Sequence, residues 1–240
     1  MSRAALLMRT DARRLLRDPM FALLSALPLA VAVVLRVAGA ENIARLPFPL
    51  EASAIATITT AGLLLLTPMM FGFVIGLMLL DERDDGVLTA VAMTPVGKTG
   101  FLARRMTTPV LWSGVASVVV LLVAGMARIP PDRLAVLALL AALQAPLLAL
   151  FLGAFAPDKV RGMALGKVGT ALVGIGALGV LAPMPWQWLA AVSPHYWMVR
   201  IAVADDTAVT AAYGAQVAAA LAVHLLALWL LARAFRARVG

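Results

Sequence analysis

Long apolar stretches limit what this chain can fold into. The clearest runs from Ile55 to Leu80, and Pro109 to Ala127 follows it after a charged interval. Further stretches cover Met20 to Val37, Leu134 to Ala156, Val168 to Leu181 and Ala212 to Leu231. A helix of about 20 mostly apolar residues crosses a bilayer, where only helices and closed barrels satisfy their backbone hydrogen bonds. The sequence therefore predicts an all-α, polytopic membrane protein with six transmembrane helices.

The amino-acid composition agrees with a membrane protein and excludes several kinds of chemistry. The chain is 63% hydrophobic and 13% charged, whereas soluble domains are about 45–50% apolar and about 25% charged. It has no cysteine, which excludes disulfides, thiolate catalysis and Cys-ligated metals. Its two histidines, His195 and His224, lie far apart in the sequence. We expect no catalytic residue and no metal site.

The basic residues are unevenly divided between the two sides that six spans define. Fifteen of the 20 lysines and arginines fall in segments that share a side with both termini. The positive-inside rule places that side, including residues 81–108, in the cytoplasm. The net charge of +8 could suggest nucleic acid, but the arginines flank apolar segments instead of forming one basic face. The expected partner of these residues is the lipid bilayer, with no nucleic acid.

The first 18 residues have the pattern of a helix that lies along a membrane surface. At about 100° per residue, small and apolar side chains fall on one side and arginines on the other. We expect an amphipathic interfacial helix over residues 1–18, with a plain cytosolic flank as the alternative. Asp18 and Pro19 then form an N-cap and a first helical position, which restart the chain as a membrane span.

Residues 182–206, between the fifth and the last span, are apolar but interrupted. Prolines and aromatic residues alternate there, among them Trp186, Trp188, Tyr196 and Trp197. Amphipathic rings favour the depth of the lipid headgroups. We expect short reentrant or interfacial helices on the extracellular side. Since no linker or repeat is visible, residues 1–240 are expected to form a single transmembrane domain.

The charged interval between the second and third spans, residues 81–108, is too polar to lie in hydrocarbon. The acidic cluster from Asp81 to Asp85 favours a helix start because of the helix dipole. An apolar pattern at helical spacing follows, and a Thr-Pro pair ends it; the residues are Val87, Leu88, Val91, Ala92, Thr94 and Pro95. The pattern indicates a short helix that could insert into a groove of another protein. A solvated loop with some inward-facing apolar residues is an equal alternative.

Two enzymatic patterns overlap this interval, and both lack their usual surroundings. Ala92 to Thr99 nearly matches a phosphate-binding loop, but a transmembrane helix and an acidic cluster precede it instead of a buried strand. Asp81 and Asp85 have the spacing of a magnesium-binding pair, so a magnesium-dependent integral-membrane transferase is one alternative. A secondary transporter is another. The scarcity of ionisable residues within the spans disfavours proton-coupled transport.

The second span carries residues suited to the path of an apolar substrate. Methionine repacks readily around different ligands, and phenylalanine adds apolar surface. The candidate residues for this path are Met69, Met70, Phe71 and Phe73. Ordinary helix packing is the competing explanation. Gly72 and Gly76, on the same span, predict the close approach of another helix.

The run from Glu82 to Val96 resembles the signature loop of type-2 ABC exporter permeases. In that family an acidic residue, then Gly-x-Leu, then Thr-Pro-Val or Thr-Pro-Leu follows the second span, as Gly86, Leu88 and Thr94-Pro95-Val96 do here. The arginine-rich first helix matches the family's elbow helix. The six spans and the segment before the last span fit as well. The chain resembles in particular small actinobacterial drug-export permeases, including those labelled fluoroquinolone exporters. Gly97 departs from the pattern, since the family often has serine there.

The resemblance implies a division of labour between several chains. Two separate ABC ATPase subunits would bind and hydrolyse ATP with magnesium, so this chain would bind no cofactor and would not be an enzyme itself. A second permease chain, identical or a sister, would complete the path for a hydrophobic or amphipathic, drug-like or lipid-like substrate. The location would be the inner (plasma) membrane of a bacterial cell, with both termini in the cytoplasm. The residues implied in ATPase coupling are Glu82, Arg83, Asp84, Asp85, Gly86, Val87, Leu88, Val91, Thr94, Pro95 and Val96.

Overall fold

The computed structural model describes residues 19–39, 42–43, 45, 52–93, 97–125, 129–204 and 211–239, and within these ranges it contains helices and turns but no strand. The interfacial helix expected over residues 1–18 lies outside the described residues, as do Thr94, Pro95 and Val96. The helices are α2 (Pro19–Ala38), α4 (Ala52–Asp84), α5 (Val87–Ala92), α6 (Gly97–Ala124), α7 (Pro131–Phe155), α8 (Lys159–Leu178), the short 3-10 helix η1 (Gly179–Leu181), α9 (Gln187–Ala190), α10 (Pro194–Ala202) and α11 (Ala211–Val239).

The described helices confirm the class of an all-α, polytopic membrane protein. Among the described residues, five helices are long and apolar enough to cross a membrane, in the ranges Ile55–Asp84, Gly100–Ala124, Pro131–Phe155, Lys159–Leu181 and Ala211–Arg238. The predicted first span corresponds to α2, whose described apolar part, Ala22–Ala38, is shorter. A helix of 20 residues such as α2 is about 30 Å long, which matches the hydrocarbon thickness of a bilayer.

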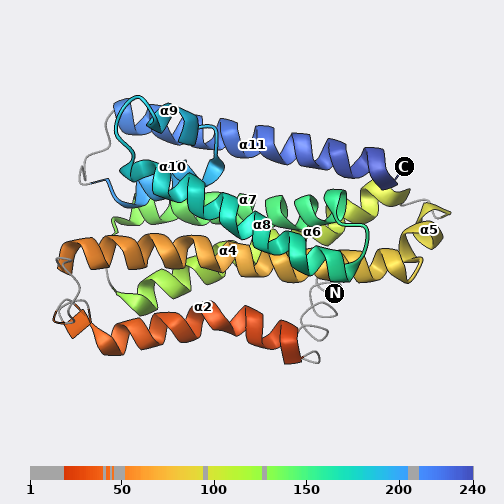
Figure 1. Ribbon diagram of the computed structural model, residues 1–240, viewed down its shortest axis with the longest axis horizontal. Helices are drawn as coiled ribbons and strands as arrows, with labels where there is room; N and C mark the ends of the chain where they lie inside the picture. The colour runs from red at the N-terminus through yellow and green to blue at the C-terminus, as the bar shows by residue number, and fades with distance from the viewer. Residues whose placement is uncertain are drawn as a thin grey trace.

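Helix α4 is the central element of the bundle, with α2, α6, α7 and α8 packed around it (Figure 1). In the most apolar stretch of α4, 78% of the residues are buried, whereas in the corresponding stretch of α11 only 11% are buried. Helices α4 and α7 approach each other closely at the two glycines of the second span, as the sequence predicted. A Cβ atom at Gly72 would overlap the carbonyl oxygen of Ala145, and one at Gly76 would lie 3.2 Å from the Cα of Ala149.

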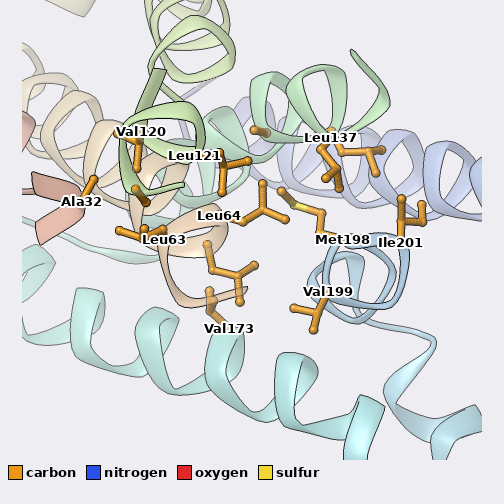
Figure 2. Packing of buried hydrophobic residues seen from close by; sticks show 14 of the residues in the cluster. Ala32, Leu63, Leu64, Val120, Leu121, Leu137, Val173, Met198, Val199 and Ile201 are labelled. Carbon is orange, nitrogen blue, oxygen red and sulfur yellow. The ribbon is translucent and has the colours of Figure 1, made fainter. Parts of the chain in front are cut away.

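Three clusters of buried side chains hold the helices together, and the smallest joins α4, α6, α7 and α11. The largest cluster joins α2, α4, α6, α7, α8, α10 and α11, and Figure 2 shows Leu64 of α4 between Leu121 of α6 and Met198 of α10. The second cluster joins the later half of α4, from Val74 to Leu80, to Leu152 and other residues of α7. Because these side chains are fully apolar, their packing fixes the positions of the helices on which the polar groups lie.

Several helices extend beyond the apolar stretches that predicted them. Helix α4 continues through Asp84 and α6 already begins at Gly97, so residues 81–108 are mostly helical instead of a loop. The acidic cluster therefore ends α4 and does not start the next helix, contrary to the prediction. Helix α8 begins at Lys159 and not at Val168. An apolar stretch marks the part of a helix that lies in lipid, whereas backbone hydrogen bonds can continue the helix into water.

Candidate functional site

The last turn of α4 is joined by polar contacts to three neighbouring helices. Glu82 forms an ion pair with Arg105 of α6 at 3.0 Å, and the two side chains are only 10% and 6% exposed. Asp81 pairs with Lys159 of α8 at 2.8 Å, with 37% and 34% of these side chains exposed. Arg83 reaches the end of α7. This turn therefore connects α4 to α6, α7 and α8 at once.

The carbonyl groups at the end of α7 accept hydrogen bonds from arginines of two other helices. Arg83 donates to the carbonyl oxygen of Ala156 at 2.7 Å and to that of Gly153 at 3.4 Å. Arg238 of α11 donates to the carbonyl oxygen of Ala154 at 3.1 Å. The last carbonyls of a helix have no partner inside it and carry partial negative charge, which a guanidinium stabilises. The chain thus gathers the ends of α4, α7 and α11 at one end of the bundle.

Helix α5 projects beyond this turn and is joined to α4 by a tight bend (Figure 1). Gly86, which precedes α5, has φ = 73°, in the left-handed region that glycine adopts without strain. We use the name α5 hairpin for the last turn of α4 (residues 81–84), helix α5 and the start of α6 at Gly97. Asp84, Asp85 and Ala90 are exposed, and Met93 is 89% exposed.

The remaining predicted coupling residues lie along the same hairpin. Val87 and Val91 are half-buried, which indicates that one side of α5 packs on the protein itself and the other faces outward. Leu88 lies on α5, but its side chain is outside the described set. The structure thus brings Glu82, Arg83 and the described residues of α5 together at one end of α4.

Three of the four residues proposed for a substrate path line one cavity. It has a volume of about 380 Å³, within the range of about 300–1,000 Å³ that is usual for ligand pockets. Phe71 is half-buried on α4 and is not among its lining residues. The lining residues are Leu24 of α2, Met69, Met70 and Phe73 of α4, Leu148 of α7, and Met163, Ala164, Gly166, Lys167 and Thr170 of α8.

A second cavity lies on the other side of Met69 and Leu148, which line both. Its volume is about 140 Å³, and its walls come from α4, α7, α8, α10 and α11. Almost all of its lining is apolar, with Gln144 of α7 and His195 of α10 as the polar side chains. The Oγ of Ser193 and the Nδ1 of His195 are 3.0 Å apart, so a hydrogen bond orients the imidazole ring.

Side-chain hydrogen bonds order residues 182–204, at the far end of the bundle from the α5 hairpin. Gln187 accepts from Tyr196 at 3.1 Å and from Arg200 at 3.0 Å, and it donates to the carbonyl oxygen of Ala182 at 2.9 Å. The segment contains the short helices α9 and α10, and the 3-10 helix η1 directly precedes it. The indole of Trp186 is 62% exposed, as expected of an aromatic ring near lipid headgroups.

Residues 81 and 85 differ in their surroundings. The carboxylate of Asp81 is engaged with Lys159, and Asp85 is exposed at the bend before α5. In the part of the chain that the structure describes, no group of three or more His, Cys, Asp or Glu side chains could hold a metal ion. No geometry of the described residues thus favours the magnesium-dependent transferase over a transport role.

Two residues that line the cavities are not identified by the sequence patterns. The apolar stretch begins after Lys167, which predicts a loop there, but this residue lies within α8 and lines the larger cavity. Gln144 lies within an apolar span whose overall pattern hides it. An isolated amide in a predicted transmembrane helix is itself a signal, since polar side chains in lipid are costly, and it could have identified Gln144.

The helices, the two cavities and the α5 hairpin define a multi-pass α-helical membrane protein. A family model described as "Fluoroquinolones export permease protein Rv2686c-like" matches residues 11–232. The chain therefore belongs to this family of export permeases, which confirms the resemblance to drug-export permeases.

Two curated relatives support this assignment. They are the fluoroquinolones export permease proteins Rv2686c and MT2760 of Mycobacterium tuberculosis, strains H37Rv and CDC 1551. Each is 28% identical to this chain over 186 residues, which is 75% of this chain and 72% of the relative. No solved structure matches the chain.

Proposed function

We propose that this chain is the membrane-spanning subunit of an ATP-driven ABC exporter and that two separate ATPase subunits dock on the α5 hairpin. ATP and magnesium would be bound by those subunits, and this chain would bind no cofactor. A second permease chain, identical or a sister, would complete the transport path. The complex would lie in the plasma membrane of a bacterial cell, with both termini of this chain and the α5 hairpin in the cytoplasm.

The observation that carries this proposal is that one helix connects the α5 hairpin to the larger cavity. The last turn of α4 contacts α6, α7 and α8 through Glu82, Arg83 and Asp81. The same helix presents Met69, Met70 and Phe73 to that cavity. A partner that moves α5 would therefore move α4 and, through these contacts, the helices around it. Such a connection is what coupling between a motor and a path requires.

The lining of the cavity supports an apolar or amphipathic, drug-like or lipid-like substrate. Its residues are mostly aliphatic, aromatic or methionine, and the charged side chain among them is Lys167. Methionine and phenylalanine can adapt to ligands of different shape. The relatives' names specify fluoroquinolones, which makes aromatic drug molecules the first substrates to test.

Docking can be tested by cross-linking, because the chain has no cysteine. A single cysteine in place of Met93, which is 89% exposed beside α5, is expected to cross-link to the ATPase. Trp186→Cys is the matched control at the opposite end of the bundle, with Trp186 62% exposed. We expect no ATPase cross-link from the control. Equal cross-linking from both positions, or labelling of the Met93→Cys variant from outside intact cells, contradicts the proposal.

Coupling can be tested by placing a charge on α5. Leu88→Asp is expected to abolish ATP-dependent uptake of a fluoroquinolone into inverted membrane vesicles, while the permease still folds and inserts. Ala90→Asp is the control, because two residues along a helix correspond to about 200° and so to the opposite face. Undiminished substrate-stimulated ATPase activity in the Leu88→Asp complex would refute the docking role of this face.

A further inference from the structure

A third cavity, beside α9 and α10, contains an arginine without a counter-charge around it. The cavity has a volume of about 260 Å³. It lies at the far end of the bundle from the α5 hairpin (Figure 1). Arg200 lines it, and the described residues around the cavity include no Asp or Glu. Arg200 forms no ion pair with any residue that the structure describes.

Hydrogen bonds hold the guanidinium of Arg200 in one orientation. Its Nη1 donates to the Oε1 of Gln187 at 3.0 Å and to the hydroxyl oxygen of Tyr196 at 2.7 Å. The amide of Gln187 is held in turn, because its Nε2 donates to the carbonyl oxygens of Ala182 at 2.9 Å and Val180 at 3.3 Å. The charged group is therefore already in place before a ligand arrives, which lowers the cost of binding.

The opposite edge of the same guanidinium is open. The Nε and Nη2 of Arg200 make no hydrogen bond with the described residues, and neither atom is enclosed by protein. In a guanidinium these two nitrogens direct parallel N–H bonds along one edge of the plane. Such a fork matches the two oxygens of a carboxylate or phosphate. A cation that is fixed on one edge and unused on the other is suited to bind an oxyanion.

The walls of the cavity select the rest of the ligand. Two indoles line it, those of Trp188 and Trp197. Trp188 is 67% exposed and is open to an entering molecule, whereas Trp197 is fixed by a hydrogen bond from its Nε1 to the carbonyl oxygen of Ala191 at 2.7 Å. An apolar cavity of about 150 Å³ can hold benzene. A cavity of about 260 Å³ therefore has room for two fused rings.

We propose that this cavity binds a planar aromatic carboxylate, with the carboxylate on the fork of Arg200 and the rings against the indoles of Trp188 and Trp197. A carboxylate conjugated with a ring is flat, so both contacts can form at once. The acyl chains of a lipid phosphate offer no flat surface to the indoles. The inference goes beyond the proposed function, because the site shares no lining residue with the other two cavities and its binding needs no ATPase.

The test uses the purified full-length permease in phosphatidylcholine nanodiscs, without ATPase or ATP. The probe is radiolabelled 2-naphthoate, which is ionised at neutral pH, and equilibrium dialysis measures its binding after subtraction of empty nanodiscs. Neutral 2-naphthamide is the control ligand of the same shape. The parent protein and all variants carry Lys167→Met, so that the charged side chain of the larger cavity does not contribute. We expect the parent to bind 2-naphthoate about tenfold or more tightly than 2-naphthamide.

Four variants separate the fork from the rings. Arg200→Lys keeps the charge but loses the fork, and it should weaken 2-naphthoate binding about tenfold or more. Trp188→Ala should weaken binding of both ligands about two- to tenfold. Trp186→Ala is its matched control, because Trp186 is similarly exposed, at 62%, but does not line the cavity. Ala191→Leu should weaken both ligands by filling space while every polar side chain of the site remains.

The outcomes distinguish this site from the export function itself. Binding of 2-naphthoate that depends on both Arg200 and Trp188 supports the site, even if no ATPase associates with the chain. Equal affinity of Arg200→Lys and the parent for 2-naphthoate overturns it, even if ATP-driven export is intact. Equal binding by Trp188→Ala and Trp186→Ala also overturns it, including the case in which Arg200→Lys does not fold. So does a parent that binds no 2-naphthoate, since lipid phosphates or water would then occupy the fork.

Discussion

The ion pair between Glu82 and Arg105 offers a direct test of how the α5 hairpin is held. Its charged atoms are 3.0 Å apart, and the side chains are only 10% and 6% exposed. Removing one partner breaks a buried ion pair, which costs about 3–5 kcal/mol. We therefore expect Glu82→Ala to lower the free energy of unfolding by this amount. Replacing both residues, with Glu82→Leu and Arg105→Met, should restore most of the loss, because apolar side chains need no counter-charge.

The neighbouring residue provides the matched control. Asp81 pairs with Lys159 at 2.8 Å, but more than a third of its side chain is exposed. A pair screened by solvent contributes only about 0.2–1 kcal/mol. Asp81→Ala should therefore have a small effect, although it removes the same charge one residue earlier in the same turn.

The measurement is an SDS titration of the purified variants in mixed micelles, followed by the fluorescence of the five tryptophans. The expected order is wild type, then Asp81→Ala and the double variant close to it, then Glu82→Ala far below. If Glu82→Ala and Asp81→Ala lose the same free energy, burial does not determine the strength of these pairs and the reasoning fails. A loss below about 1 kcal/mol for Glu82→Ala would have the same meaning.

Three other substitutions, one with a matched control, test α4, the bend that follows it and α8. Gly72→Ala should lower the free energy of unfolding by about 1–3 kcal/mol, because the new Cβ would overlap the carbonyl oxygen of Ala145. Gly62→Ala is the control, since a Cβ there meets open space and should be neutral or stabilising. Thermal denaturation compares the two variants. Gly86→Ala should cost about 1–2 kcal/mol because φ is 73°, and it should reduce ATPase cross-linking through Met93→Cys. Lys167→Met, in the wall of the larger cavity, should leave the fold intact. It should reduce vesicle uptake of a fluoroquinolone carboxylate more than uptake of the methyl ester. Equal reduction of both would exclude recognition of the carboxylate charge by Lys167.

Much of the fold could be predicted because membrane insertion leaves a strong pattern in the sequence. Long apolar stretches identified the spans, and Gly72 and Gly76 identified the face of α4 that α7 approaches. The prolines and tryptophans of residues 182–206 identified a segment of short helices. These features depend on local composition, which a single sequence records directly.

The helix ends and the long-range polar pairs could not be predicted in the same way. The acidic cluster favoured a helix start by charge alone, but α4 continues through Asp84 because Glu82 and Arg83 find partners on other helices. Lys167 predicted a loop, because charge usually marks the membrane boundary, yet its helix continues past it. Which side chains meet across the bundle depends on helix rotation and packing, and no local pattern encodes that information.

The proline within α4 has a mechanical consequence for the part of the chain that it precedes. Pro68 has no N–H and interrupts the backbone hydrogen bonds of this 33-residue helix one position before Met69. The segment from there to Asp84 extends about 24 Å along the helix axis. A bend of about 10° at the proline would displace the far tip by about 4 Å. A pivot at this position would thus convert a small change of angle beside the cavities into a displacement of several ångströms at the α5 hairpin. A displacement of the α5 hairpin would likewise produce a small change of angle beside the cavities.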